Sequence, residues 1–229
     1  MSSRILFVLT SHATLGTTGR STGWYLSEAA HPHAVLSDAG FAIDFASPAG
    51  GAAPMDGVSR TDPANAAFLD DAVAMAKVQN TTRLVDVDPS AYAAVYIVGG
   101  HGTMWDLPEN AALSAIAAHI YDAGGVVGAV CHGVAGLVNT RLANGELLVT
   151  GKAVSAFTNA EEAAVGLTND VPFLLETALR AHGAVVSTAA NFAPIVSVDT
   201  RLVTGQNPAS ARGVGEAIAA ALVPASASV

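Results

Sequence analysis

Short, wholly apolar runs recur along this chain, and they constrain its fold more than any other feature. The segments Arg4–Thr10 and Val126–Val130 are such runs, and a third strand is expected at 91–98. Continuous apolar runs of strand length are typical of strands that are covered on both faces, as in parallel sheets. The chain therefore predicts a central sheet that is buried between two layers of helices.

Helical patterns and Gly- or Pro-rich loops separate the predicted strands. Helices are expected at 22–39 (in two pieces, interrupted at His31-Pro32), at 65–78, after a capping Asp106 with Pro108 in the first turn, at 171–182 and at 210–222. Further strands are expected at 41–46, 152–157 and 184–187, and a hairpin from 195–198 and 202–204. This alternation predicts an α/β fold with a doubly wound, mostly parallel sheet flanked by helices, in a single domain over 1–229 with a frayed tail at 224–229.

The charge pattern excludes several classes of partner. The chain has 10 Lys and Arg against 19 Asp and Glu, and no segment concentrates basic residues, so no nucleic-acid partner is expected. No apolar run approaches the roughly 18 residues that a membrane span needs, and Met1 to Arg4 lack a signal-type start. The single cysteine cannot form an internal disulfide, which fits a reducing compartment. We therefore expect a cytoplasmic protein without a membrane partner.

Cys131, the only cysteine, lies at the point where an apolar strand ends. The sequence Ala129-Val-Cys-His-Gly133 has small residues two before and two after Cys131, which is typical of a sharp strand-to-helix turn that exposes a nucleophile. A helix starting there would lower the pKa of the thiol, and its amides with Gly100 could hold an oxyanion. The alternative interpretation is that Cys131 is a small buried hydrophobic residue.

Other polar residues also follow predicted strands, where ligands bind in doubly wound sheets. They lie in Ser11-His12, in Gly99-Gly100-His101-Gly102 and in Glu161-Glu162 after Phe157. The histidines show no closed-site spacing with other ligands, so no metal is expected. The glycines lack the full dinucleotide pattern and no phosphate loop is present, so no nucleotide cofactor is expected either.

Four motifs together resemble the ThiJ/PfpI superfamily. They are Ala129-Val-Cys-His-Gly133, Gly99-Gly-His-Gly102, Glu28-Ala-Ala-His-Pro32 and Thr204-Gly-Gln-Asn-Pro-Ala-Ser210. The resemblance is strongest to the heat-shock-protein branch that includes glutathione-independent glyoxalase III, also called D-lactate dehydratase. It implies a flavodoxin-like, class I glutamine amidotransferase-like fold, a homodimer and no cofactor.

The resemblance also implies roles for individual residues. Cys131 would be the nucleophile, His132 the proton-transfer group, and Glu28 a carboxyl group that reaches the sulfur. Glu162 would orient His132, with the neighbouring Glu161 as the alternative. Because an ionised carboxylate would raise the thiol pKa, we expect Glu28 to be neutral when the thiolate forms. The remaining assignments place Gly99, Gly100 and His101 at the oxyanion position and pocket rim, and His31 packed around Glu28.

The implied reaction is the conversion of methylglyoxal, a reactive 2-oxoaldehyde, to lactate through a hemithioacetal on Cys131. Three alternatives stay open on the sequence. A protein deglycase would use the same residues, and so would a cysteine peptidase or amidase. A stress-related holdase chaperone would instead need an exposed apolar patch and would not need the cysteine. The segment Asn191-Phe-Ala-Pro194 departs from the tryptophan-containing version expected in yeast relatives, which bears on the shape of the pocket.

Overall fold

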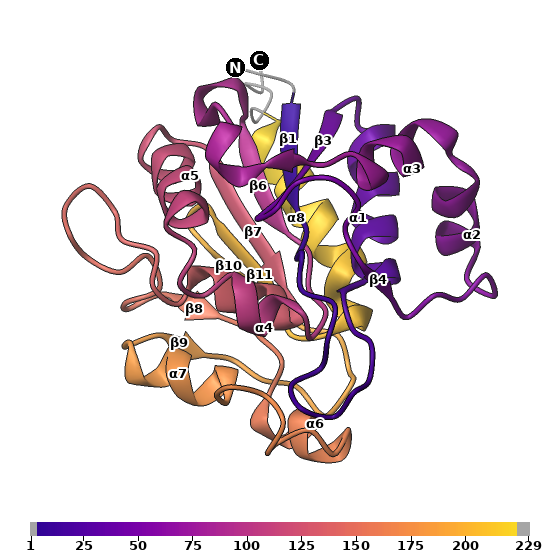
Figure 1. Cartoon of the computed structure of the whole chain (residues 1–229). Helices are drawn as coiled ribbons and strands as arrows, with labels where there is room; N and C mark the ends of the chain where they lie inside the picture. Colours follow the sequence, from indigo (N-terminus) through magenta and orange to yellow (C-terminus); the bar gives the residue numbers. More distant parts are fainter. Residues whose placement is uncertain (1–3, 224–229) are drawn as a thin grey trace.

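A seven-stranded sheet forms the centre of the protein, whose computed structural model describes residues 4–223 (Figure 1). The strand order is β10-β11-β7-β6-β1-β3-β5. The strands are β1 (Arg4–Val8), β3 (Ala42–Ser47), β5 (Thr82–Arg83), β6 (Ala94–Ile97), β7 (Val126–Val130), β10 (Val196–Asp199) and β11 (Leu202–Gly205). All neighbours are parallel except β10 and β11, which form the predicted antiparallel hairpin. The predicted mostly parallel α/β sheet is thus confirmed.

Alternate residues of the central strands enter two separate cores. In β1, Leu6 and Val8 face one core, whereas Ile5 and Phe7 face the other, and all four are fully buried. Side chains alternate between the faces of a strand, so a strand that is covered on both sides must be apolar throughout. This explains why the strands appear in the sequence as unbroken apolar runs.

Helices cover both faces of the sheet. Residues of α4 (Thr103–Asp106), α5 (Ala111–Asp122) and α7 (Leu175–Ala181) pack into the first core. Residues of α1 (Leu26–Asp38), α2 (Pro63–Asp70), α3 (Ala72–Gln79) and α8 (Ala211–Leu222) pack into the second. The carboxyl ends of the parallel strands point down in Figure 1, toward α4 and α6 (Asn159–Ala164). Among the described residues, no helix is long and apolar enough to cross a membrane.

Two small parallel pairs lie outside the main sheet. They are β2 (Trp24–Tyr25) with β4 (Met55–Asp56), and β8 (Ala153–Val154) with β9 (Val185–Val186). The strands predicted at 152–157 and 184–187 are therefore shorter than expected, and they pair with each other outside the central sheet. The helix predicted at 171–182 begins only at Leu175. The tail predicted at 224–229 lies outside the described residues.

The prediction that His31-Pro32 splits the first helix is wrong, because α1 continues through Pro32. A proline inside a helix has no N–H for the carbonyl four residues earlier, which here belongs to Glu28. The hydroxyl of Tyr96, on β6, donates to that carbonyl oxygen at 2.7 Å. A side chain from the sheet therefore satisfies the acceptor that Pro32 leaves open, and the helix is not broken.

Two other helix boundaries differ from the prediction, and each is explained by a capping side chain. The helix expected at 65–78 is divided at Asp71, whose carboxylate accepts from the amides that begin α3. Helix α5 is capped by Asn110 rather than Asp106, so Pro108 precedes it. The Asp106 carboxylate instead accepts hydrogen bonds from Thr10 and Ser11 after β1. The carboxylate of Asp106, which the local spacing predicted as a helix cap, is therefore used in contacts with residues that are distant in the chain.

Candidate active site

Cys131 lies on a strained turn between β7 and the 3-10 helix η3 (Cys131–Leu137). Its φ angle is +56°, a left-handed conformation that residues other than glycine rarely adopt. The side chain is 4% exposed and lines a cavity of about 210 Å³. The sharp turn expected after this strand is therefore present, and it presents the sulfur to this cavity.

Two glycines after β6 allow the backbone to pass close to this turn. A Cβ on Gly99 would lie 2.2 Å from Glu28 Oε2 and 2.9 Å from Cys131 Cβ, so a side chain does not fit there. Gly100 has φ +113°, which favours glycine, and it lines the cavity with Cys131. The Gly-Gly pair is thus required by space and backbone conformation, and it brings Gly100 to the cavity beside Cys131.

Cys131, His132 and Glu162 form a continuous line of polar contacts. His132 Nδ1 is 3.4 Å from Cys131 Sγ, and His132 Nε2 is 2.7 Å from Glu162 Oε2. Glu162 comes from α6, which begins at Asn159 with a capping box between Thr158 and Glu161. Of the two neighbouring glutamates, Glu162 is therefore the one that contacts His132.

His101 adds a second imidazole to the same carboxylate. Its Nε2 lies 2.9 Å from Glu162 Oε1, and its ring centroid lies 4.0 Å from that of His132. With Glu162 ionised, both contacts are hydrogen bonds only if each histidine has its proton on Nε2. The Nδ1 of neutral His132 then faces the thiol as an acceptor.

The charge states follow from burial and from these contacts. Burial, followed by the charge of His101, lowers the pKa of His132 to about 4 despite the opposing effect of Glu162. Burial raises the pKa of Glu162, but hydrogen bonds from His101 and His132 outweigh it and lower the value to about 2. At neutral pH the pair is a neutral imidazole beside a carboxylate, an arrangement suited to accepting a proton from a thiol.

Glu28, from the first turn of α1, is completely buried beside Cys131 and Gly99. Neither carboxyl oxygen has a partner with full hydrogen-bond geometry among the described residues. Burial raises the pKa of Glu28 to about 8, although the Cys131 thiol and the Gly99 amide oppose this shift. The carboxyl group is thus protonated at neutral pH, as the sequence led us to expect, and its O–H is free to donate to a thiolate.

The expectation that a helix N-terminus lowers the thiol pKa is wrong for the unliganded protein. Burial, followed by the charge of Glu28, raises the pKa of Cys131 well above its ordinary value, and the His132 amide only opposes this. The amide of His132, in the first turn of the 3-10 helix η3, lowers the pKa of the thiol, but by less than burial raises it. Protonation of Glu28 removes the charge repulsion, so the thiolate depends on Glu28 and His132 more than on the helix.

Several cavity residues were not among the predicted site residues. They are Tyr25, Phe157, Val165, Phe192 and Pro208, which line the cavity together with the predicted group. The sequence predicts Phe157 only as the last residue of a strand. It indicates Phe192 only as part of the segment that lacks the tryptophan expected in yeast relatives. Their elements are far apart in the chain, so no local pattern in the sequence indicates that they share a wall.

Two histidines considered at the sequence level lie elsewhere. His12 stacks on Trp105 with ring centroids 5.0 Å apart and is not a cavity residue. His31, on α1, lies with its Nε2 3.0 Å from Asp62 Oδ2, on the loop before α2. Its packing around Glu28 stays a prediction.

One group of described residues has the composition of a metal site. The ligand atoms of His101, His132 and Glu162 lie within 4.8 Å of one another. Both imidazoles already hydrogen-bond to the carboxylate at 2.7 and 2.9 Å, which accounts for the cluster without an ion between them.

Fold and site together define a doubly wound α/β protein with a buried cysteine on a strained turn, backed by a histidine and two glutamates. The model of the DJ-1/PfpI family matches residues 22–221, and the chain belongs to this family. Glyoxalase 3 of Candida albicans is 32% identical over 95% of this chain and 98% of its own length.

Two solved structures are also similar over nearly the whole chain. Rapid Encystment Protein 24 kDa of Francisella tularensis has a TM-score of 0.93 and 41% identity, over 97% of this chain and 100% of that one. Glyoxalase III of Candida albicans has a TM-score of 0.87 and 31% identity, over 95% of this chain and 96% of that one. The expected resemblance to this family is thus confirmed.

Proposed function

We propose that the protein is a glutathione-independent glyoxalase that converts a 2-oxoaldehyde such as methylglyoxal to the 2-hydroxy acid, here lactate. The observation that carries the proposal is the line from Cys131 Sγ to His132 at 3.4 Å and on to Glu162 at 2.7 Å, beside a cavity of about 210 Å³. Similarity to Glyoxalase 3 of Candida albicans over nearly the whole chain supports the same activity.

The reaction begins with proton transfer from Cys131 to Nδ1 of His132, which faces the sulfur. The thiolate attacks the aldehyde carbon and forms a carbon–sulfur bond, and the oxyanion of the hemithioacetal lies toward the amides of Gly100 and His132. Glu162 holds the imidazolium that forms. The buried O–H of Glu28 donates to the sulfur before the attack, which favours the thiolate.

Hydrogen then moves between the two carbonyl carbons of the substrate. His132 first gives the proton taken from Cys131 to the hemithioacetal oxyanion and becomes neutral again. It then removes the proton from the former aldehyde carbon and passes it to the ketone oxygen, which gives an enediol. The O–H proton on the former aldehyde carbon is finally moved through His132 to the neighbouring carbon, which gives a thioester of lactate. Water adds to the thioester, the carbon–sulfur bond breaks, and lactate leaves with Cys131 restored. The sum is methylglyoxal plus water to lactate, without an external oxidant or reductant.

The test is to incubate the purified protein with methylglyoxal in the absence of glutathione and to measure lactate with a stereospecific assay. The wild type should form lactate, and Cys131→Ser should lose at least about 100-fold in rate because the nucleophile is lost. Glu146→Gln, an exposed carboxylate far from the cavity, is the control and should keep the wild-type rate. Absence of lactate from the wild type would falsify the glyoxalase proposal.

A deglycase would use the same cysteine, so a second substrate separates the two. Regeneration of unmodified lysine or arginine side chains in a methylglyoxal-modified peptide, with release of lactate, faster than consumption of free methylglyoxal in the same sample, would favour the deglycase. The reverse ratio favours the glyoxalase.

We also propose that the protein acts in the cytoplasm as a homodimer. Charged residues make up only 13% of the chain, against roughly 25% in typical domains, which leaves more uncharged surface for a subunit contact. Sedimentation velocity at micromolar concentration should give a mass twice that of the chain. A single species at the mass of one chain would contradict the dimer.

A further inference from the structure

The carboxylate of Glu161 has no part in the contacts that reach Cys131, yet it is fully buried and fully hydrogen-bonded. Its Oε1 accepts from the side-chain amides of Gln206 and Asn207 at 3.0 and 2.9 Å, and from the backbone N–H of Phe192 at 2.8 Å. Its Oε2 accepts from the backbone and hydroxyl of Thr158, both at 3.0 Å. A buried charge with this many donors holds its neighbours in place.

The same two amide side chains bind the backbone on either side of Phe192. Gln206 Oε1 accepts from the N–H of Ala189 at 2.8 Å, and Asn207 Nδ2 donates to the carbonyl of Ala193 at 2.8 Å. We call residues 189–193 the wall segment. The two ends of the wall segment are therefore linked to Glu161 through one side chain each. Phe192, within the segment, hydrogen-bonds to Glu161 directly.

Phe192 has a backbone conformation that is unfavourable for a bulky residue. Its φ is +63°, in the left-handed region, and its side chain is 49% exposed rather than packed in a core. The ring lines the cavity and lies 6.4 Å from that of Phe157. Strain that is maintained by buried hydrogen bonds and leaves an aromatic ring half exposed at a pocket indicates a functional position.

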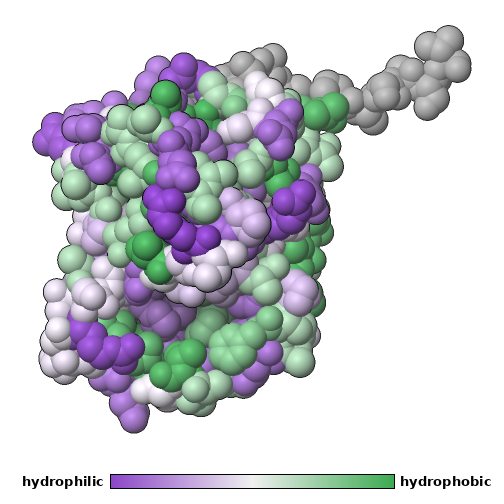
Figure 2. Space-filling model, turned by 90° about the vertical axis from the view of Figure 1, so that its right-hand side faces the viewer, coloured by the Kyte–Doolittle hydropathy of each residue, from purple (hydrophilic) through white to green (hydrophobic). Residues whose placement is uncertain are grey.

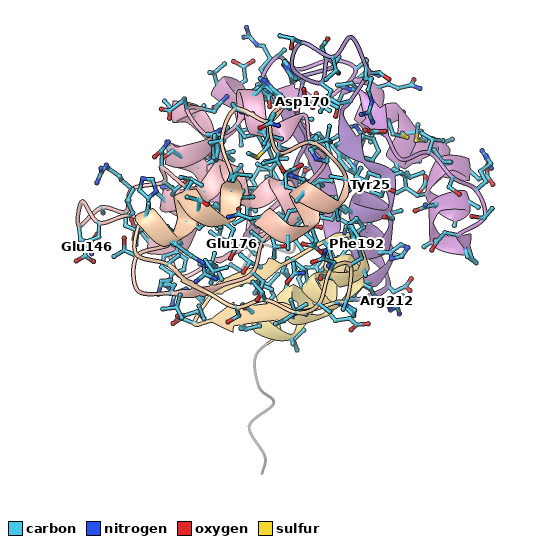
Figure 3. All side chains as sticks on the ribbon, turned by 90° about the horizontal axis from the view of Figure 1, so that it is seen from below. Tyr25, Glu146, Asp170, Glu176, Phe192 and Arg212 are labelled. Atoms are coloured by element: carbon cyan, nitrogen blue, oxygen red, sulfur yellow. The ribbon has the colours of Figure 1, made fainter. Side chains whose placement is uncertain are left out.

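The chemistry of the cavity indicates what this ring contacts. Tyr25, Phe157, Val165 and Pro208 contribute the other apolar surfaces, and no lysine or arginine is among its described lining residues. Figure 3 views this end of the molecule from below and labels Tyr25 and Phe192, which lie close to α6. Aromatic and aliphatic walls bind uncharged groups, and a carboxylate on the substrate would find no cation among the lining residues.

We propose that Phe192 is a specificity-determining residue and that Glu161 is the residue that positions it. The cavity takes 2-oxoaldehydes whose ketone carbon bears an uncharged apolar group, and an aromatic group gains the most from contact with Phe192. This inference rests on the proposed function and names its substrate class. It also explains why two glutamates are adjacent on α6: Glu162 orients His132, and Glu161 holds the wall segment.

The first test compares kcat/KM for phenylglyoxal and methylglyoxal, which differ only in a phenyl or methyl group. Phe192→Gly relieves the backbone strain and removes the ring, so the phenyl-to-methyl ratio should fall about fivefold. Phe192→Leu keeps apolar bulk and should give an intermediate ratio. Thr200→Gly is the matched control, because Thr200 has φ +58° in the β10–β11 turn. A fall of less than twofold in Phe192→Gly, or a rise, overturns the assignment.

The second test does not need turnover. Phenacyl bromide and bromoacetone both alkylate a thiolate with loss of bromide, and Cys131 is the only thiol in the chain. For each protein, the rate of alkylation by phenacyl bromide is divided by the rate of alkylation by bromoacetone, and this ratio is divided by the same ratio measured with free glutathione. The resulting value should be about fivefold lower in Phe192→Gly than in the wild type. If the wild type turns over neither aldehyde but this ratio falls, the glyoxalase proposal fails and the assignment of Phe192 stands. If turnover is found and both ratios stay unchanged, the assignment fails and the function stands.

Glu161→Gln tests the positioning role. The substitution removes the negative charge that the donors of Gln206, Asn207 and Phe192 share on Oε1, and it turns one acceptor into an NH2 group that faces donors. The wall segment is then held less firmly, so the phenyl-to-methyl ratio should fall in the same direction as in Phe192→Gly. A purely structural role would lower the melting temperature and leave this ratio unchanged. Should Glu161→Gln not fold, Gln206→Met, which removes the side-chain link between Glu161 and the backbone of Ala189, is measured in the same way, and an unchanged ratio overturns the positioning role.

Discussion

At the scale of single residues, this site depends on three carboxyl groups in different surroundings. Glu28 has no full hydrogen-bond partner and is protonated near neutral pH, with a pKa raised by burial to about 8. Glu162, between two imidazoles, stays ionised, with its pKa lowered to about 2. Glu161 accepts from five donor groups, and these hydrogen bonds lower its pKa although burial opposes them. The three residues are of the same type, so their different surroundings determine their different protonation states and contacts.

The raised pKa of Glu28 predicts a specific dependence of stability on pH. A carboxyl group that binds its proton more tightly when folded stabilises the fold fully below the pKa of the unfolded chain, about 4.5, and loses this contribution as pH rises to about 8. From pH 5 to pH 8 this group should lower the free energy of unfolding by on the order of 3 kcal/mol. Glu28→Gln should lack this decrease.

The measurement is urea unfolding of both proteins at pH 5, 6, 7 and 8. The exposed Glu146→Gln should follow the wild-type curve and serves as the control. Parallel curves for wild type and Glu28→Gln would show that Glu28 is not protonated in the folded protein.

At the scale of elements, α1 brings Glu28 to the sulfur because the helix continues through Pro32. Continuation depends on the Tyr96 hydroxyl, which donates to the carbonyl of Glu28 at 2.7 Å from the neighbouring strand β6. Close packing of α8 adds to this, since a Cβ on Gly215 would lie 2.9 Å from Pro32. The helix, the sheet and the Glu28 carboxyl group are thus coupled at one turn.

Removal of the Tyr96 hydroxyl tests this coupling. Tyr96→Phe leaves a buried carbonyl without its donor and should lower the free energy of unfolding by about 1–3 kcal/mol. Tyr92→Phe is the matched control, because its hydroxyl contact to Asp44 is long, at 3.4 Å, and partly exposed. That substitution should change stability by less than about 0.5 kcal/mol.

A double-mutant cycle identifies the acceptor. Pro32→Ala restores the N–H that the Glu28 carbonyl lacks, so Tyr96→Phe should cost less in that background than in the wild type. Equal costs in the two backgrounds would mean that Tyr96 does not act through this carbonyl.

At the scale of the whole molecule, most large apolar residues of the described part of the chain lie in the two cores. The large hydrophobic residues that remain exposed come from separate segments: Val58, Val73, Val85, Val165, Val185, Phe192, Val198 and Val223. The face in Figure 2 shows hydrophobic and hydrophilic residues interspersed. A holdase chaperone would need a continuous apolar surface, so the distribution favours an enzyme over this alternative.

The protein should therefore fail to suppress the heat-induced aggregation of a test protein at equimolar concentration. Light scattering measures this directly, with an inert globular protein of similar size as the control. Suppression that persists in Cys131→Ser would contradict the prediction and favour the holdase.

The sequence by itself determined the buried parallel strands and the turn at Cys131. Both follow from local chemistry, because a strand covered on both faces must be apolar throughout and a sharp turn needs small neighbours. The resemblance to the family added the contact between Glu28 and the thiol, from which a carboxyl group that is neutral when the thiolate forms was predicted.

Tertiary structure alone decided which side chains meet across the fold. It placed Glu162 on His132 and Glu161 on the wall segment, although the two are adjacent in the chain. It also kept α1 continuous at Pro32, and it made burial rather than the helix N-terminus control the pKa of Cys131. These outcomes depend on distances between residues about 30 or more positions apart and on the water excluded around them, which local spacing does not encode.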